Sequence, residues 1–251
     1  MADNIQLVAH RGEPFSFPEN SLLGFSHVLQ SGATYIETDI HVTADGVVVL
    51  SHDENLNKLT GRNISITKSN YQTFKDIPAG FPKRFSNKYT DCRIATLPQF
   101  SALLTDWPEV TCFIEIKRDS LSCFGHKAVD LVIESLQAIA TQSVLISFDY
   151  ESLVYARNKY HYPVGWVLPE WSSQNKTRAE QLTPEYLFVD TDFCPQHNTE
   201  LWPGSWKWVV YTVNTLKSIK KYTDLGISII ETDRLSELQQ EYDNAPLNNE
   251  P

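Results

Sequence analysis

The chain has 251 residues, of which 41% are hydrophobic, and its formal net charge at pH 7 is −10. This length fits one α/β barrel or two modest domains, and the acidic charge argues against nucleic acid as a partner. No apolar run approaches the ~20 residues of a membrane span, so we expect no transmembrane segment.

Strand-type apolar runs alternate with segments of helical period along the chain. The expected strands comprise residues 6–9, 35–41, 111–116, 144–147, 164–168, 186–190, 208–213 and 228–232, with a hairpin return at 47–51. The expected helices comprise residues 20–30, 97–104, 125–140, 150–159, 177–181, 215–225 and 236–242. This alternation predicts a single (β/α)8 TIM barrel over residues 1–251, with a doubly wound open sheet as the alternative.

Residues 54–96 interrupt this alternation with turn-forming residues and weak periodicity. The segment carries eight Lys or Arg and three acidic residues, so its charge is +5 in a chain whose remainder sums to −15. We expect a small insertion over the barrel mouth, after the hairpin of the second strand. A solvated surface loop, which is the commoner fate of such a composition, is the alternative.

Three carboxylates stand near the expected ends of two successive strands. Glu37 and Asp39 are two residues apart and share the inward face of the second strand, and Glu115 has the inward position in the third. Buried carboxylates are costly unless they are paired or coordinated, and an all-oxygen set suits a hard divalent cation, Mg²⁺ or Ca²⁺. A structural ion pair, for example Lys117 with Asp39, is the alternative.

Two histidines and two cations also lie at strand ends. His10 closes the first strand and His52 closes the hairpin return, and neutral imidazoles near pH 7 can share general acid and base work. Arg11 offers bidentate recognition of a phosphoryl group, Lys117 offers a point charge, and Gly12 would let the backbone turn close to the ligand. We therefore expect a site for metal-assisted cleavage of a phosphodiester.

Three further polar residues have weaker assignments. Asn20 is expected as the N-cap of the first helix, and Glu19 is expected to support the site by orienting His10 or Arg11. His41 has the inward parity of the second strand and is the main rival as a metal ligand. A hairpin residue past the barrel rim is the better interpretation of His41, because a histidine would soften an otherwise all-oxygen site.

The motifs occur in a fixed order that is far more specific than any single triplet. They are His-Arg-Gly at 10–12, Pro-Glu-Asn-Ser at 18–21, Glu-Thr-Asp at 37–39, Thr-Ala-Asp-Gly at 43–46, Ser-His-Asp at 51–53 and Glu-Ile-Lys at 115–117. Weaker matches are Tyr-Thr-Val-Asn at 211–214 and Glu-Thr-Asp-Arg at 231–234. In this ordered set the chain resembles the glycerophosphodiester phosphodiesterases of the bacterial cytoplasmic type, over nearly its whole length.

The resemblance implies a barrel with a small insertion and the hydrolysis of glycerophosphodiesters to glycerol 3-phosphate and an alcohol. It implies that His10 and His52 are the acid–base pair and that Arg11 and Lys117 contact the phosphate. It also implies that Glu37, Asp39 and Glu115 are the ligands of one divalent cation. It also implies that a hydroxyl of the substrate's own glycerol attacks phosphorus. Water would then open the cyclic phosphate to give glycerol 3-phosphate.

Two departures from the family pattern affect substrate detail. Tyr211 stands where the family usually has Trp, and the last strand lacks the usual Asp-Gly and closing Pro. A lysophospholipase D-like phosphodiesterase is an alternative function, which the aromatic residues of the insertion keep open: Phe74, Phe81, Phe85 and Tyr89. A catalytically silent phosphate-binding barrel is another, but no proposed histidine or carboxylate is missing.

The cysteines and the N-terminus bear on localisation. Cys92, Cys112, Cys123 and Cys194 show no metal or redox spacing, so reduced thiols are the simplest interpretation. The N-terminal residues lead almost directly into the first strand without the pattern of a signal peptide. We therefore expect a cytoplasmic protein.

Overall fold

The computed structural model describes residues 5–194 and 200–243. Eight parallel strands form a ring that β1 closes by pairing with both β2 and β9. In ring order they are β1 (Gln6–His10), β2 (Tyr35–Val42), β4 (Thr111–Ile116), β5 (Ser143–Ser147), β6 (Val164–Val167), β7 (Tyr186–Asp190), β8 (Lys207–Tyr211) and β9 (Ile229–Thr232). Strand β3 (Val48–Leu50) pairs antiparallel with β2 outside the ring. The closed ring confirms the predicted TIM barrel and excludes the open sheet.

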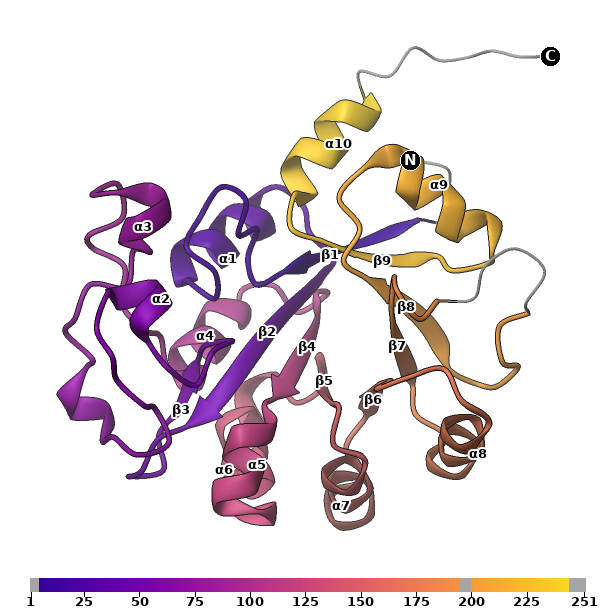
Figure 1. Cartoon of the computed structure of the whole chain (residues 1–251), viewed down its shortest axis with the longest axis horizontal. Coiled ribbons are helices and arrows are strands. Elements are labelled where there is room, and N and C mark those ends of the chain that lie inside the picture. Colours follow the sequence, from indigo (N-terminus) through magenta and orange to yellow (C-terminus); the bar gives the residue numbers. More distant parts are fainter. Residues whose placement is uncertain (1–4, 195–199, 244–251) are drawn as a thin grey trace.

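Helices follow the strands and lie outside the ring (Figure 1). They are α1 (Leu22–Gln30), α4 (Leu97–Leu104), α5 (Arg118–Phe124), α6 (His126–Ser135), α7 (Tyr150–Tyr160), α8 (Ser173–Leu182), α9 (Leu216–Asp224) and α10 (Leu235–Asp243). Across residues 5–194 and 200–243, no helix combines the length and the apolar character that a bilayer crossing requires.

Several helices differ in their bounds from the sequence prediction. The helix expected over 125–140 is interrupted at Leu136, which separates α6 from a 3-10 turn, η2 (Gln137–Ile139), and it is preceded by α5, which was not predicted and which Gly125 at φ +57° separates from α6. Helix α8 is longer than expected, and it begins where Ser172 accepts a hydrogen bond from Asn175 N. By contrast, α4 has its expected bounds, which a capping box between Thr96 and Gln99 fixes.

Helix α1 begins two residues later than the sequence predicts. Its N-cap is Ser21, which has an extended backbone (φ −94°, ψ 142°) and accepts a hydrogen bond from Gly24 N at 3.1 Å. Asn20 has φ +56°, a left-handed conformation outside the extended region that an N-cap residue adopts. The prediction of Asn20 as the N-cap is therefore wrong, and its side chain makes other contacts, described below.

The barrel separates two hydrophobic cores. Inside the ring, Phe113 packs against Tyr186 and Phe188 with ring centroids 4.9 and 5.0 Å apart. Outside the ring, Ile36 and Ile114 belong to the larger core beneath the helices, as the alternation predicts. Because side chains alternate along a strand, the residue two positions beyond an inner core residue points into the barrel mouth: His10 follows Val8, Glu37 follows Tyr35, Glu115 follows Phe113, and Glu231 follows Ile229.

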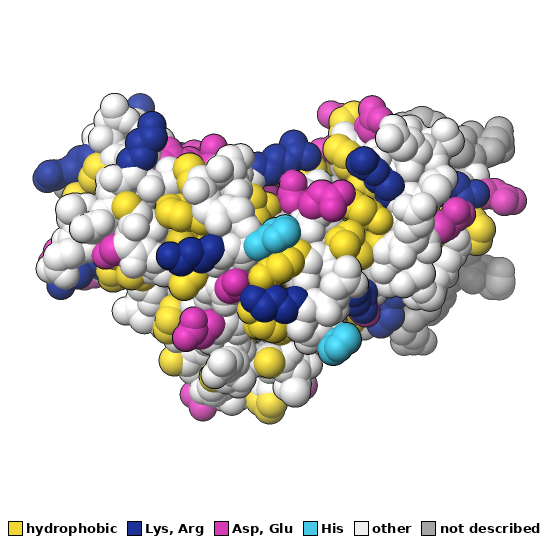
Figure 2. Space-filling model, turned by 90° about the horizontal axis from the view of Figure 1, so that it is seen from below, with side chains coloured by type: hydrophobic (Ala, Val, Ile, Leu, Met, Phe, Trp, Pro, Cys, Tyr) yellow, Lys and Arg dark blue, Asp and Glu magenta, His cyan; other side chains and the backbone are white. Residues whose placement is uncertain are grey.

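The segment between β3 and α4 contains three short helices, α2 (Asn57–Thr60), η1 (Tyr71–Thr73) and α3 (Pro82–Phe85), drawn at one side of the barrel in Figure 1. It has a small core of its own, built from Val49, Leu56, Leu59, Ile66, Phe74, Ala79 and Ile94. The segment is thus packed rather than a fully solvated loop. Figure 2 shows Lys and Arg side chains at this end of the molecule, with hydrophobic side chains among them.

Candidate active site

A cavity of about 100 Å³ lies at the carboxyl ends of the barrel strands, which is where TIM barrels place their active sites. Its polar wall comes from β9, β1, β2 and β4 and from the loops that follow β1, β3 and β4, and consists of Glu231, His10, Arg11, Glu37, His52, Glu115 and Lys117. Its apolar wall comes from β5 to β8 and consists of Ile146, Phe148, Val167, Phe188 and Tyr211. The mouth is therefore divided into one polar and one apolar arc.

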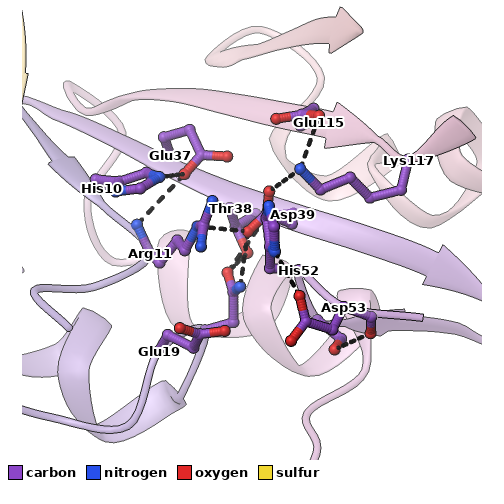
Figure 3. A network of polar contacts seen from close by, with 12 residues as sticks. His10, Arg11, Glu19, Glu37, Thr38, Asp39, His52, Asp53, Glu115 and Lys117 are labelled. Atoms are coloured by element: carbon purple, nitrogen blue, oxygen red, sulfur yellow. Dashed lines mark hydrogen bonds and ion pairs between the residues drawn. The ribbon is translucent and has the colours of Figure 1, made fainter. Parts of the chain in front are cut away.

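The three carboxylates predicted as metal ligands lie together. Oxygen atoms of Glu37, Asp39 and Glu115 are all within 4.8 Å of one another. One of these groups, Glu37, has a buried oxygen, Oε1, with no hydrogen-bond partner among the described residues. The ion pair named as the alternative is present as well, because Lys117 Nζ lies 2.6 Å from Asp39 Oδ1 and 2.8 Å from Glu115 Oε1 (Figure 3).

Burial and neighbouring charges shift the pKa values of the two β2 carboxylates, Glu37 and Asp39, in opposite directions. The pKa of Glu37 is well above its ordinary value because of burial first and the negative charges of Asp39 and Glu231 next. Burial also acts to raise the pKa of Asp39, but Arg11 and Lys117 outweigh it and hold the pKa well below its ordinary value. Asp39 is thus the site's firmly ionised carboxylate, while Glu37 lacks a matching positive charge.

Each predicted catalytic histidine is anchored by a carboxylate through its Nδ1. His10 Nδ1 lies 2.7 Å from Asp233 Oδ1, and His52 Nδ1 lies 2.8 Å from Asp53 Oδ1. The His10 side chain is 12% exposed and that of His52 is 36% exposed, so His10 is the deeper of the two. Both rings line the cavity. In each ring Nδ1 contacts the anchoring aspartate, Asp233 or Asp53, and Nε2 is the nitrogen that this aspartate does not bind.

Arg11 is held against the end of β2. Its Nε lies 2.9 Å from Asp39 Oδ2, and its backbone N–H donates to the Glu37 carbonyl oxygen at 3.0 Å. Arg11 and Lys117 both line the cavity, and neighbouring carboxylates raise the pKa of each, against the effect of burial. Both side chains therefore stay protonated and present positive charge to an anion in the cavity.

The two residues predicted to support the site make different contacts from those expected. The Asn20 side chain accepts hydrogen bonds from Thr38 Oγ1 and Asp39 N at 2.8 and 3.2 Å, and its Nδ2 donates to Asp39 Oδ2 at 2.9 Å. Glu19 pairs with Lys58 Nζ of the 54–96 segment at 2.6 Å, so its direct contact is with that segment. Asn20 thus fixes Asp39, and through it Arg11.

Gly12 and His41 have structural surroundings. A Cβ atom on Gly12 would lie 2.9 Å from Phe25 N, so the glycine permits a close approach of this turn to α1. His41 is fully buried, with Nε2 3.1 Å from the His52 carbonyl oxygen and Nδ1 3.2 Å from Ser120 Oγ. It belongs to neither group of potential metal-binding side chains that the described residues form.

Sequence reasoning noted a second Glu-Thr-Asp unit only as a weaker family match and gave it no role in the site, although it lies on the other side of β1. Asn214 Oδ1 accepts from Thr232 Oγ1 and Asp233 N, both at 2.9 Å, and its Nδ2 donates to Asp233 Oδ2 at 3.0 Å. These are the same contacts that Asn20 makes with Thr38 and Asp39. The signal was present in the sequence, because residues 231–233 repeat residues 37–39 letter for letter.

The repeated unit brings Glu231 into the cavity. Glu231 is 4% exposed, and its Oε1 lies 3.6 Å from His10 Nε2. Burial raises its pKa to about 7, against the opposing effect of His10. The strands β2 and β9 flank β1, so two Glu-Thr-Asp units enclose His10 and Arg11 from both sides.

A larger groove of about 1080 Å³ adjoins the cavity and shares four of its residues: His52, Glu115, Lys117 and Phe148. Its outer wall comes from the 54–96 segment and includes Lys58, Phe81 and Lys83. A substrate larger than the cavity can therefore extend toward the insertion. Lys88 lies elsewhere, beside a separate hollow near α1.

The comparisons with known proteins agree with this geometry. The sequence model of the glycerophosphoryl diester phosphodiesterase family matches residues 10–237. The chain is 39% identical to a glycerophosphodiester phosphodiesterase of Bacillus altitudinis over 241 residues, covering 91% of this chain and 94% of that protein. A shorter match, 32% identical, covers 44% of this chain and 35% of a lysophospholipase D of Rattus norvegicus.

Solved structures of the same kind share the fold. The phosphodiesterase of Oleispira antarctica, solved with the product sn-glycerol-3-phosphate, has a TM-score of 0.85 and 23% identity over 96% of this chain and 98% of that one. A glycerophosphodiester phosphodiesterase of Agrobacterium tumefaciens has a TM-score of 0.75 and 19% identity over 94% and 99%. With the family match spanning most of its length, the chain belongs to the glycerophosphoryl diester phosphodiesterase family and is an enzyme of that kind.

Proposed function

We propose that this enzyme hydrolyses glycerophosphodiesters to glycerol 3-phosphate and an alcohol, with one divalent cation and two histidines as acid and base. The observation that carries the proposal is the meeting of two carboxylate-anchored histidines, two cations and three carboxylates at one cavity. The product bound to the Oleispira antarctica relative supports glycerol 3-phosphate as the product here.

Glu37, Asp39 and Glu115 would hold the divalent cation. The buried Glu37 Oε1 without a hydrogen-bond partner among the described residues fits this assignment, since an unpaired buried carboxylate oxygen is costly. An all-oxygen set of three carboxylates suits Mg²⁺ or Ca²⁺. When bound, the cation would supply Lewis acidity toward a phosphoryl oxygen and lower the pKa of a nearby hydroxyl.

Arg11 and Lys117 would hold the phosphate anion. Arg11 uses Nε for Asp39, which leaves the rest of its guanidinium for the phosphate, and Lys117 is fixed between Asp39 and Glu115. Asn20 supports this arrangement by hydrogen-bonding Asp39. Glu19 would support it indirectly, by pairing with Lys58 of the insertion. Preorganised cations of this kind stabilise charge on a phosphoryl group without reorganisation during the reaction.

His10 and His52 would share the proton transfers. His10 is the deeper residue, so it would take the proton of the glycerol hydroxyl that attacks phosphorus. His52 lines both the cavity and the groove, so it would protonate the alcohol that leaves toward the groove. The bond from phosphorus to the leaving oxygen breaks as the hydroxyl oxygen bonds to phosphorus, and water then opens the cyclic phosphate.

A lysophospholipase D-like activity is the second candidate. The groove of about 1080 Å³ offers more room than a small head group needs, and the rat lysophospholipase D match points the same way. The aromatic residues of the insertion that suggested this alternative differ in their exposure to the groove. Phe74 and Tyr89 are buried, while Phe81 lines the groove. Only Phe81 among these three is placed to contact a lipid chain in the groove.

A substrate panel tests the proposal. Purified enzyme with Mg²⁺ or Ca²⁺ should release glycerol 3-phosphate from glycerophosphocholine, glycerophosphoethanolamine and glycerophosphoglycerol, measured by a coupled dehydrogenase assay. Faster turnover of lysophosphatidylcholine to lysophosphatidic acid and choline would favour the second candidate. Binding of glycerol 3-phosphate without turnover of any diester would show a catalytically silent barrel.

We also propose that the enzyme works in the cytoplasm. All four cysteines are free, and Cys112 is fully buried, where burial holds its pKa well above the ordinary value. Unpaired thiols are typical of a reducing compartment. Fractionation of cells that produce the native protein, with activity followed in the cytoplasmic and membrane fractions, tests this assignment.

A further inference from the structure

Glu231 is a buried carboxylate in the cavity wall to which the mechanism above gives no task. It is 4% exposed, and no described residue donates a hydrogen bond to its side chain. Its Oε1 lies 3.6 Å from His10 Nε2, beyond hydrogen-bonding distance. A largely buried carboxylate that accepts no hydrogen bond from the described residues is costly, so its place in the cavity wall points to a hydrogen-bond partner that the ligand brings.

The position of Glu231 limits what that partner can be. It stands on β9, between His10 on β1 and Tyr211 on β8, where the polar arc of the cavity meets the apolar arc. The phosphate anion would be repelled there, and Arg11 and Lys117 offer it a favourable place elsewhere in the cavity. The group that suits an ionised Glu231 is therefore a hydrogen-bond donor or a cation.

We propose that Glu231 accepts a hydrogen bond from a hydroxyl of the substrate's glycerol moiety, an inference that rests on the proposed function. The carbon atoms of glycerol would then contact the apolar arc, including Phe188 and Tyr211, while its hydroxyls face Glu231 and His10. Glu231 becomes the residue that selects the moiety ending as glycerol 3-phosphate. The leaving alcohol is directed to the groove on the opposite side.

The rival partner is a divalent cation between His10, Glu37 and Glu231, whose ligand atoms lie within 4.8 Å of one another. The oxygens of Glu37 argue against it. Its Oε2, which faces His10, already accepts a hydrogen bond from Arg11 N at 3.3 Å. Its unpartnered oxygen is Oε1, which points away from His10 in Figure 3, on the side where Glu115 lies. The Glu37 oxygen that lacks a partner among the described residues, Oε1, therefore faces a cation site shared with Glu115 and not one shared with His10 and Glu231.

Two ligands that differ only in their hydroxyls test the proposal. We would measure dissociation constants for sn-glycerol 3-phosphate and n-propyl phosphate by calorimetry in saturating Ca²⁺, for the wild type, Glu231→Gln and Glu231→Leu. The wild type should prefer glycerol 3-phosphate. Glu231→Leu should weaken glycerol 3-phosphate on the order of tenfold and leave propyl phosphate unchanged, because only the hydroxyl contact is lost. The affinity of Glu231→Gln for glycerol 3-phosphate should lie between those of the wild type and Glu231→Leu, because glutamine keeps an acceptor oxygen.

Several results would overturn it. These are equal wild-type affinities for the two phosphates, equal weakening of both by Glu231→Leu, or a Ca²⁺ stoichiometry that falls from two per chain to one in that variant. Tyr211→Phe is the matched control at the neighbouring strand, and a loss of the hydroxyl preference there instead would assign the contact to Tyr211. Binding needs no turnover, so failure of the wild type to hydrolyse any glycerophosphodiester would reject the proposed function separately.

Discussion

His10 Nδ1 lies 2.7 Å from the Oδ1 atom of Asp233, a residue 223 positions later in the chain. The contacts of Asn214 help to fix the direction of this hydrogen bond. Asn214 Oδ1 accepts from Thr232 and from the Asp233 N–H, so its Nδ2 must donate to Asp233 Oδ2. Both hydrogen bonds from His10 and Asn214 hold the pKa of Asp233 below its ordinary value, against the effect of burial. Asp233 is therefore an acceptor, and the proton of neutral His10 belongs on Nδ1, which leaves the Nε2 lone pair for a substrate.

The histidine pair gives the first prediction. His10→Ala and His52→Ala should each lower kcat on the order of 10²-fold or more, the usual scale for loss of a general acid or base. The double variant should lose far less than the product of the two single effects, because the residues act in one mechanism. Steady-state kinetics with glycerophosphocholine measures both effects.

The leaving group distinguishes the two roles. A diester of glycerol 3-phosphate with nitrophenol has an acidic leaving alcohol that needs no proton, so it should restore much of the rate of His52→Ala and little of that of His10→Ala. Rescue of His10→Ala alone would reverse the assignment. A variant with near-normal kcat on glycerophosphocholine would remove that histidine from the chemistry.

Metal removal gives the second prediction. Protein treated with a chelator should lose its activity and regain it with Mg²⁺ or Ca²⁺. When ionised, the three carboxylates Glu37, Asp39 and Glu115 carry one more negative charge than the positive charges of Arg11 and Lys117 can neutralise. Glu115→Gln should lower cation affinity and kcat together while leaving the thermal midpoint close to that of the wild type. Full activity after chelation would reject the metal site. A fall in thermal stability alone would make Glu115 only the ion-pair partner of Lys117.

The insertion gives the third prediction and a matched control. Lys83 lines the groove beside the active site, whereas Lys88 lies over the Tyr89 ring and lines a separate hollow. Charge near a binding groove steers an anionic substrate, and salt screens the effect. Lys83→Glu should lower kcat/KM severalfold at low ionic strength with kcat little changed, and the difference should shrink in high salt. Lys88→Glu makes the same charge change and should have a much smaller effect. Equal effects of the two variants would mean that only net charge matters.

Glu54 gives the fourth prediction, on stability and pH. It accepts hydrogen bonds from Ser65 Oγ, Thr67 Oγ1 and Thr67 N across the insertion. Partial burial acts to raise its pKa, but these hydrogen bonds lower it below the ordinary value of 4.5. Since the folded pKa is the lower one, the stabilisation is complete above pH 4.5 and is lost as the pH falls through the folded pKa.

Glu54→Gln should therefore lower the free energy of unfolding at pH 7 by about 0.5–1 kcal/mol, a modest value because the side chain is partly exposed. Urea titrations of both proteins at pH 7 and at decreasing pH should show this difference narrowing in acid. A constant difference across the whole pH range would show that the charge of Glu54 contributes nothing. Hydrogen exchange should locate the loss of protection at residues 54–67.

The alternation of side chains made part of the site predictable. Ile36 and Ile114 mark the outer face of their strands, so Glu37, Asp39 and Glu115 had to point inward. Because the carboxyl ends of parallel barrel strands meet at one mouth, residues from separate motifs could be assigned to one place. The family followed from the order of the motifs, whereas the alternation of strands and helices favoured a barrel and left an open sheet as the alternative.

Contacts between distant segments were not predictable in this way. Asn20 reads locally as an N-cap, but its left-handed backbone passes that role to Ser21, and its amide instead holds Thr38 and Asp39. Glu19 was expected beside His10 or Arg11, and Lys58 of the insertion pairs with it. Local propensity sets which residues can cap or pair, and the partner that is actually present decides which of them do.

By itself, the sequence determined the succession of strands and helices and the inward-facing carboxylates, because these depend on local periodicity along each element, and it favoured a barrel over an open sheet without excluding the latter. Only the tertiary structure decided that β9 lies beside β1, and hence that Asp233 binds His10 and that Glu231 reaches the cavity. The repeated Glu-Thr-Asp triplet was visible in the sequence, but its two copies are 194 positions apart, as residue numbers 37 and 231 show. Barrel closure brings them to either side of one strand, and no local pattern encodes that proximity.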